Sequence, residues 1–226
     1  MGYFNEVNAI IHGFSGSTKE IIYLKNYLNH QGLNAHTITL AGHGGTRKDL
    51  YRTSHIDWLN SAEIEIARLR KQYRRINLVG FSMGGLISAN LSTIYDVDKL
   101  VLVNTPVYVW NMRVIFKQIL NDLRNGEREN IEYFKKGMSI VSPKSSIEFF
   151  KILNKSKKIF NQVPSQSFIM QCLEDETVHY RSAEYIKNEL GERAQVRYYN
   201  GGCHQVFLRN TSIRDAFCHE IYNFLK

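Results

Sequence analysis

Residues 77–88 carry the strongest chemical signal in this chain of 226 residues. They form an apolar run that leads into the pattern Gly-x-Ser-x-Gly, with Ser82 at its centre, and then into a helical segment. At a sharp turn between a strand and a helix, glycines allow close backbone approach and the serine hydroxyl projects above the sheet. A glycine-rich turn with an incidental serine is the alternative, which the flanking strand and helix disfavour. We therefore predict that Ser82 is a nucleophile.

A serine hydroxyl becomes an effective nucleophile only when a nearby base accepts its proton and a carboxylate orients that base. Asp175 and His204 each follow a predicted strand, in the chain order serine, acid, histidine. Both loops leave the carboxyl ends of their strands, which is the edge of a parallel sheet where Ser82 also emerges. Taken singly, residues 174–176 could be a solvated acidic turn and His204 an ordinary loop histidine. Together they predict a triad of Ser82, Asp175 and His204.

The sequence His-Gly-Phe-Ser-Gly at residues 12–16 ends the first predicted strand. An acyl-transfer enzyme must stabilise the oxyanion of its tetrahedral intermediate, commonly with two backbone N–H groups. We predict that Phe14 and Met83 supply these N–H groups. His12 is expected to be a structural hydrogen-bonding residue, and His43 is expected to shape a neighbouring loop, without a catalytic role for either.

Short apolar runs alternate with longer amphipathic segments along the chain, which is typical of βαβ units around a buried parallel sheet. The predicted strands span residues 7–11, 34–38, 76–81, 99–103, 167–171 and 195–199. The predicted helices span residues 19–30, 57–73, 83–92, 182–190 and 212–225. The predicted fold class is therefore α/β, with a doubly wound and mainly parallel sheet of about six strands.

Residues 104–164 interrupt this alternation because they contain no convincing strand. A helix is predicted at residues 145–155, and an earlier apolar stripe at helical spacing comprises Val109, Met112, Phe116, Ile119 and Leu123. We predict a single domain over residues 1–226, with a helical cap inserted at about 104–164. Phe116 and Ile119 are predicted to line an apolar acyl pocket above Ser82. The alternative is that the stripe only seals the cap onto the sheet.

The formal charge of +8 could indicate binding to nucleic acid or to an anionic surface. Most of this charge lies in residues 104–164, which hold eleven Lys and Arg residues against five acids. Since no nucleic-acid-binding motif accompanies it, a solvated basic cap explains the charge, and we expect no nucleic-acid partner.

Three further features bear on metal sites, membranes and localisation. The three cysteines, Cys172, Cys203 and Cys218, lack metal-ligand spacing, so no metal site is expected. No apolar run approaches the roughly 20 residues of a membrane span, and we expect no integral membrane association. The first residues lack the pattern of a secretion signal, so we expect a cytoplasmic protein.

Taken in order, these motifs resemble the α/β-hydrolase superfamily and, within it, the small bacterial carboxylesterase and monoacylglycerol lipase group. The resemblance covers nearly the whole chain and rests on His12-Gly13-Phe14-Ser15-Gly16, Ala41-Gly42-His43-Gly44, Asp57-Trp58, the segment from Gly80 to Gly85, Asp175-x-x-Val178 and His204. It implies a Ser-Asp-His triad, an acyl-enzyme, no cofactor, a helical cap that bears the acyl pocket, and esters or monoglycerides as small-molecule substrates.

The chain departs from the family pattern at two loops. Cys172 stands where family members often have glycine three residues before the acid, and Gly202-Cys203 stands where they often have Ser-Gly.

Two alternatives to an esterase also remain open. One is a catalytically silent hydrolase fold that binds a small molecule, and the other is a hydrolase of a thioester, an amide or a carbon–carbon bond. The sequence leaves the oligomeric state open.

Overall fold

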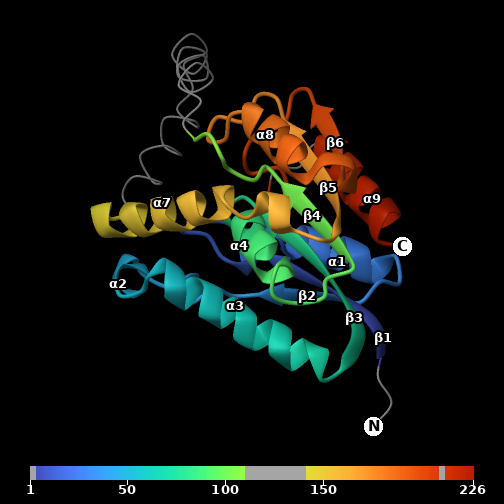
Figure 1. The fold of residues 1–226 in the computed structure, drawn as a ribbon, viewed down its shortest axis with the longest axis horizontal. Helices are drawn as coiled ribbons and strands as arrows, with labels where there is room; N and C mark the ends of the chain where they lie inside the picture. The colour runs from blue at the N-terminus through green and yellow to red at the C-terminus, as the bar shows by residue number, and fades with distance from the viewer. Residues whose placement is uncertain (1–3, 110–140, 209–211) are drawn as a thin grey trace.

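The computed structural model describes residues 4–109, 141–208 and 212–226 (Figure 1). At its centre is a sheet of six strands in the order β2-β1-β3-β4-β5-β6, with every neighbouring pair parallel. The strands are β1 (Phe4–Ile11), β2 (Ala35–Ile38), β3 (Tyr73–Phe81), β4 (Lys99–Val103), β5 (Gln166–Cys172) and β6 (Ala194–Tyr199). The chain runs from β1 outward to β2 and then returns past β1 to β3. The loops after β1 and β3 therefore flank the switch point, where open α/β sheets bind their ligands.

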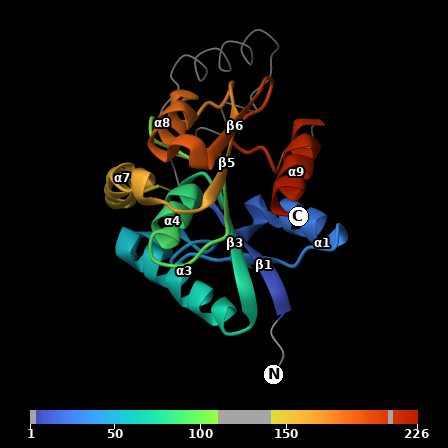
Figure 2. The same ribbon diagram turned by 45° about the vertical axis from the view of Figure 1, so that its right-hand side comes forward.

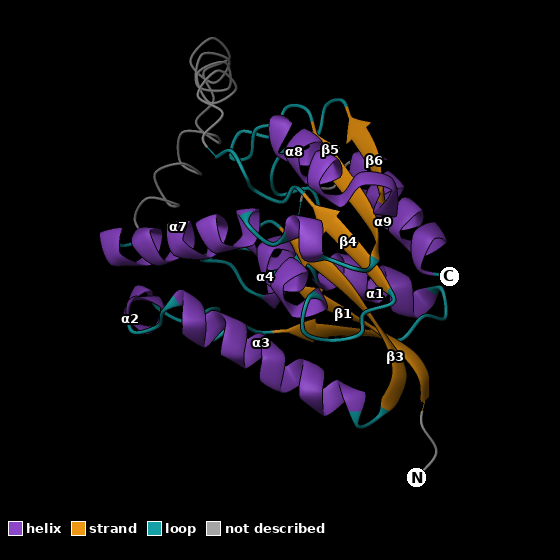
Figure 3. Cartoon of the chain, viewed as in Figure 1, coloured by secondary structure: helices purple, strands orange, loops and turns teal. Residues whose placement is uncertain are grey.

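Helices cover both faces of the sheet (Figure 3). On one face lie α1 (Ile22–His30) and α9 (Ser212–Leu225), and on the other lie α3 (His55–Arg70), α4 (Met83–Ser92) and α8 (Arg181–Leu190) (Figure 2). Because side chains alternate along a strand, Ile10 of β1 packs in the α1 and α9 cluster, whereas Ala9 and Ile11 pack in the opposite one. The sheet is thus buried on both faces, as a parallel sheet requires.

All six predicted strands and all five predicted helices are present, so the predicted fold class is confirmed. Several predicted helix bounds are wrong, and the helix predicted to run to residue 73 ends at Arg70, since Tyr73 already begins β3. The helix predicted from residue 57 begins at His55, because Ser54 caps it and Asp57 completes the capping box. The segment predicted to be helical from residue 19 begins as a short 3-10 helix, η1 (Thr18–Glu20), before α1.

The shorter elements complete the described fold. The sequence analysis missed α2 (Arg47–Tyr51), which begins with a second capping box formed by Thr46 and Asp49. The remaining short elements are η2 (Phe160–Gln162) and η3 (Gly191–Arg193). Among the described residues, no helix combines the length and the apolar character that a membrane span needs.

The helix predicted at residues 145–155 is present as α7 (Pro143–Lys157), and it lies along α4 and against α2 and α3 (Figure 1). Asn90 Nδ2 of α4 donates to Ser156 Oγ of α7 at 2.8 Å. The predicted pocket residues Phe116 and Ile119 lie outside the described residues. The cap as a whole and its acyl pocket therefore stay predictions.

Candidate active site

Ser82 lies between the last residue of β3 and the first residue of α4, at φ 53° and ψ −124°. A positive φ is strained for a residue with a side chain and persists only where the surroundings enforce it. Here the Ser82 N–H donates to Val103 O at 2.8 Å. A Cβ at Gly80 would lie 2.4 Å from Gly85 Cα, and one at Gly84 would lie 2.2 Å from the backbone oxygen of Ile11. The sharp turn therefore requires glycine on both sides of Ser82.

The structure brings Ser82, His204 and Asp175 into one chain of hydrogen bonds. Ser82 Oγ lies 3.0 Å from His204 Nε2, and His204 Nδ1 lies 2.8 Å from Asp175 Oδ2. A carboxylate can only accept a hydrogen bond, so Nδ1 carries the hydrogen and the lone pair of Nε2 faces the serine hydroxyl. Asp175 is fully buried, while Ser82 and His204 are each 6% exposed. This geometry allows His204 to accept the proton of Ser82.

The carboxylate of Asp175 is fixed by its own loop. Its Oδ1 accepts from the backbone N–H of Thr177 at 2.8 Å and from that of Val178 at 2.7 Å. These bonds leave Oδ2 to face the imidazole. The valine three residues after the acid is thus a backbone donor to that acid.

Three consecutive acids bind the loop that carries His204. Glu174 Oε2 accepts from Gly201 N at 2.6 Å, and Glu176 Oε2 accepts from His204 N at 3.0 Å. Asp175, between them, binds the imidazole itself. The alternative of a solvated acidic turn is therefore wrong for Asp175 and Glu176, which are both buried.

The electrostatic surroundings of His204 raise the pKa of its imidazole. Burial by itself lowers the pKa of this imidazole. The charge and hydrogen bond of Asp175 outweigh burial, and the more distant carboxylates of Glu176 and Glu20 add to the effect, so the net pKa is raised above its usual value. An imidazole in this setting is well suited to take up a proton.

The predicted oxyanion donors belong to two segments that lie next to Ser82. Met83 is the first residue of α4, so its N–H has no acceptor within the helix. Phe14 lies in the loop after β1, where Gly16 N donates to Gly13 O at 3.3 Å and closes a turn. A Cβ at Gly13 would lie 3.2 Å from Ser82 Cβ, so this loop passes directly beside the nucleophile.

His12 and His43 are buried and neutral. His12 Nε2 accepts from Leu40 N at 3.2 Å, and burial, helped by nearby His43, lowers the pKa of His12 to about 4. His43 Nδ1 bonds to Ala41 O at 3.0 Å, and burial lowers the pKa of His43 to about 4. These contacts agree with the structural roles expected for both residues. Among the described residues, no three His, Cys, Asp or Glu side chains are grouped so that they could hold a metal ion.

Comparison with known protein families shows which family this chain belongs to. The family model for the alpha/beta hydrolase fold matches residues 10–135, which is more than half of the chain. The chain belongs to this family.

Named relatives of this α/β hydrolase act on esters. The carboxylesterase of Bacillus subtilis (strain 168) is 25% identical, over 96% of this chain and 91% of the relative. The thermostable monoacylglycerol lipase of Bacillus sp. (strain H-257) is 23% identical, over 78% of this chain and 73% of the relative. A solved structure described with two metagenome-derived lipolytic enzymes superposes with a TM-score of 0.78 at 16% identity, over 97% of this chain and 93% of that one. The resemblance to the carboxylesterase and monoacylglycerol lipase group is thus confirmed.

Asn104 is a site residue of this α/β hydrolase that the sequence analysis missed. It follows β4 at φ 45°, a conformation that asparagine tolerates better than most residues. Its Oδ1 accepts from Cys172 N at 2.9 Å, and its Nδ2 donates to His204 O at 3.1 Å. Asn104 therefore ties the end of β5 to the histidine loop. An asparagine directly after a buried strand was the available signal.

The two departures from the family pattern compensate for each other. A Cβ at Gly202 would lie 2.4 Å from Cys172 Sγ, so the cysteine fills the space that a side chain at residue 202 would need. A larger residue before the acid is thus matched by a glycine before the histidine. The loops that carry Cys172 and Gly202 therefore pack together although both residues depart from the family pattern.

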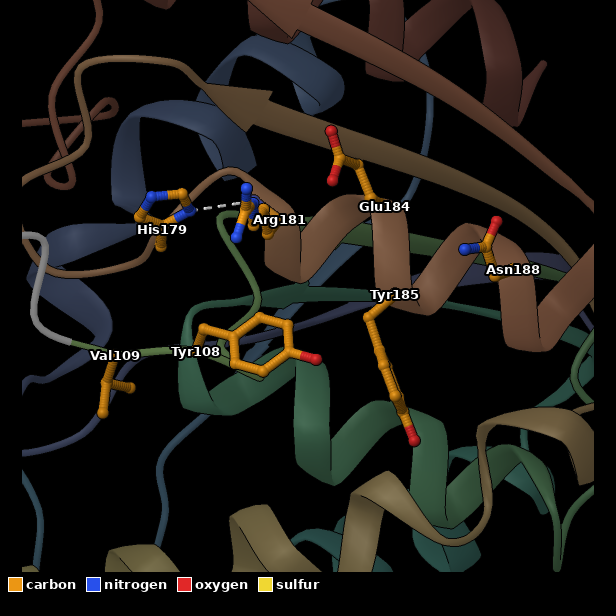
Figure 4. A pocket seen from close by; sticks show the side chains of 7 residues that line it. All are labelled: Tyr108, Val109, His179, Arg181, Glu184, Tyr185 and Asn188. Atoms are coloured by element: carbon orange, nitrogen blue, oxygen red, sulfur yellow. Dashed lines mark hydrogen bonds between the residues drawn. The ribbon is translucent and has the colours of Figure 1, made fainter.

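A hollow of about 480 Å³ lies beside α8 (Figure 4). Val109, which lines the hollow, forms an isolated antiparallel β-bridge with Val178 in the loop that carries Asp175. The lining residues are Tyr108, Val109, His179, Arg181, Glu184, Tyr185 and Asn188. Since Ser82, Asp175 and His204 do not line it, this hollow is not the site of the predicted chemistry.

Proposed function

We propose that this α/β hydrolase cleaves carboxylic esters, with Ser82 as the nucleophile, His204 as the general base and Asp175 as the residue that orients His204. The observation that carries the proposal is the hydrogen-bonded chain from Ser82 Oγ through His204 to Asp175 at a strained strand-to-helix turn. The named esterase and lipase relatives support the choice of ester among the bonds such a site can attack.

In the first half-reaction, His204 Nε2 takes the proton of Ser82 as Oγ attacks the ester carbonyl carbon. The carbonyl oxygen becomes an oxyanion, to which the N–H groups of Phe14 and Met83 donate. Asp175 stabilises the imidazolium that has formed. His204 then gives its proton to the alcohol oxygen, the carbon–oxygen bond breaks, and the acyl group remains on Ser82.

In the second half-reaction, water takes the place of the alcohol. His204 removes a proton from the water as its oxygen attacks the acyl carbon, and the same two N–H groups stabilise the second oxyanion. When the bond to Ser82 Oγ breaks, His204 returns the proton to that oxygen. The products are a carboxylic acid and the free enzyme, and these steps require no cofactor.

The surroundings of the proposed oxyanion loop favour an apolar acyl group. The ring of Phe14 stacks on Phe149 of α7 at 5.0 Å between centroids and lies 5.7 Å from the ring of Trp58. We propose short to medium acyl chains as substrates, held under a cap at about residues 104–164. Phe116 and Ile119 remain the proposed lining of the acyl pocket.

Hydrolysis of a nitrophenyl ester series from acetate to dodecanoate tests the proposal, with Ser82→Ala as the control. We expect turnover by the wild type only, and attachment of a fluorophosphonate probe to the wild type but not to the variant. kcat/KM should rise from acetate to a short or medium chain, since each buried methylene contributes up to about 0.8 kcal/mol. Equal turnover by Ser82→Ala would contradict the nucleophile, and a profile that falls from acetate onward would contradict the apolar pocket.

We also propose that the enzyme acts in the cytoplasm. The buried free thiols of Cys172 and Cys218 support this proposal, because reduced cysteines persist in reducing compartments. Cell fractionation with an antibody to the protein tests it, and recovery mainly from the external medium would contradict it.

A further inference from the structure

Glu20 is a buried acid that the proposed mechanism does not use. It is the last residue of η1, it is 9% exposed, and no ion pair of the described residues includes it. Burial raises the pKa of Glu20, although hydrogen bonds from Gln205 and Gly13 and the nearby imidazole of His204 oppose this effect. A buried carboxyl group without a cation is costly unless hydrogen bonds compensate for the lost water. The bonds that Glu20 makes therefore indicate what it does.

Its two oxygens accept from two different loops. Oε2 accepts from the backbone N–H of Gly13 at 3.1 Å, and Oε1 accepts from Nε2 of Gln205 at 3.0 Å. Gly13 directly precedes Phe14, a proposed oxyanion donor, and Gln205 directly follows His204. One carboxyl group thus joins the loop of the donor to the loop of the base.

The loop of residues 13–16 is fitted closely around this carboxyl group. A Cβ at Gly16 would lie 2.1 Å from Glu20 Oε2. A Cβ at Gly13 would lie 3.3 Å from the same oxygen and 3.2 Å from Ser82 Cβ. Gly13 therefore lies between the Glu20 carboxyl group and the side chain of Ser82 and is close to both.

On the basis of the proposed function, we propose that Glu20 is a positioning residue that holds the oxyanion loop and the histidine loop in register around Ser82. It touches neither substrate nor reacting atoms. Its effect is on the distance between the Phe14 N–H and the imidazole, both of which must meet the same tetrahedral intermediate. A displacement of about 1 Å between such groups costs on the order of 100-fold in rate.

Three variants test this inference: Glu20→Ala, Glu20→Gln and Gln205→Ala. Glu20→Ala removes both acceptors, so we expect kcat to fall about 10- to 100-fold with KM changed less than about twofold. Glu20→Gln should restore most of kcat. Its side-chain oxygen can accept from Gly13, and its amide can donate to Gln205 Oε1, which is buried and has no partner, once the Gln205 amide rotates.

Asn77→Ala is the matched control for lost stability, because Asn77 is also buried and donates to Asn8 Oδ1 at 2.9 Å within the sheet. We expect this control to lower Tm without lowering kcat. Gln205→Ala should lower kcat by itself and add little to Glu20→Ala, since both break the same bridge.

The outcomes separate this inference from the proposed function. An active wild type with an unchanged kcat in Glu20→Ala would overturn the role of Glu20 alone. Equal losses of kcat in Glu20→Ala and Glu20→Gln would also overturn it, because the bridge would then not be the reason for the loss. A wild type that cleaves no ester would overturn the proposed function and, with it, this inference.

Discussion

Ser82 lies in a turn that close packing against neighbouring glycines shapes, whereas His204 is held by hydrogen bonds to residues that lie 28, 29 and 100 positions away. Around Ser82 the decisive feature is the absence of two side chains. Gly80 leaves space for the backbone of Gly84 and Gly85 in the same turn, and Gly84 leaves space for the backbone of Ile11 in β1. Around His204 the decisive feature is hydrogen bonds, which come from Asp175, Glu176 and Asn104.

Because of this difference, substitutions in the two regions should have different effects. Where space is decisive, adding one methyl group forces segments apart and costs stability. Where hydrogen bonds are decisive, an exchange that keeps the acceptor should be tolerated, and one that presents a donor in its place should not. The predictions below use these two rules.

The largest effect is expected from Ser82→Ala, which removes Ser82 Oγ, the atom that hydrogen-bonds to His204. We expect kcat for a nitrophenyl ester to fall on the order of 10⁶-fold, because the proposed nucleophile is gone. Circular dichroism and Tm should show a folded protein. Comparable ester turnover by the purified variant would show that Ser82 is not the nucleophile.

The next largest effect is expected from Asp175→Asn, which presents an amide where the imidazole N–H needs an acceptor. We expect a loss on the order of 10⁴-fold in kcat, because the wrong tautomer of His204 is then favoured. Glu174→Gln and Glu176→Gln keep an oxygen that accepts from the backbone of the histidine loop, so both should retain most activity. If one of these two were the damaging change, Asp175 would not be the orienting acid.

Gly84→Ala and Gly85→Ala test the role of space. The added Cβ would lie 2.2 Å from Ile11 O at residue 84 and 2.0 Å from Thr105 Oγ1 at residue 85. We expect each to lower the free energy of unfolding in urea, by about 1–3 kcal/mol for Gly85→Ala and by more for Gly84→Ala, because a sheet backbone cannot move aside.

Thr105→Ala supplies the control for Gly85→Ala. Thr105 Oγ1 is buried without a hydrogen-bond partner, so its removal breaks no bond. The double variant should regain part of the lost stability. Additive losses would mean that contact with Thr105 is not the cause.

The smallest effect concerns pH. The proposed base must be neutral to act, and the pKa of His204 is raised above 6.5. kcat/KM should therefore fall on the acid side with a midpoint above pH 6.5. Glu176→Gln removes one of the negative charges that raise this pKa, so the midpoint should move to lower pH. A midpoint that moves upward would contradict this account of the electrostatics.

The sequence by itself determined the parts of the molecule that are encoded locally. Apolar runs and amphipathic segments predicted every strand of the sheet, and the glycines around Ser82 predicted the turn, because both patterns report on neighbours in the chain. Candidates for the acid and the histidine followed from their places at strand ends, since parallel strands end at one edge. The missed helix α2 is only five residues long, too short for periodicity to reveal.

Only the tertiary structure decided what surrounds these residues. Glu20 and Gln205 are 185 positions apart, and Asn104 reaches His204 across 100 positions. No periodic pattern relates such pairs, since a hydrogen bond requires only that two polar atoms meet about 3 Å apart after the chain has folded. The contact between Cys172 and Gly202 also depends on tertiary structure, because the Cys172 side chain occupies space beside a different loop, the one that carries Gly202. The sequence thus proposes candidates for the reacting atoms, and the packing of distant loops fixes the geometry in which those atoms meet.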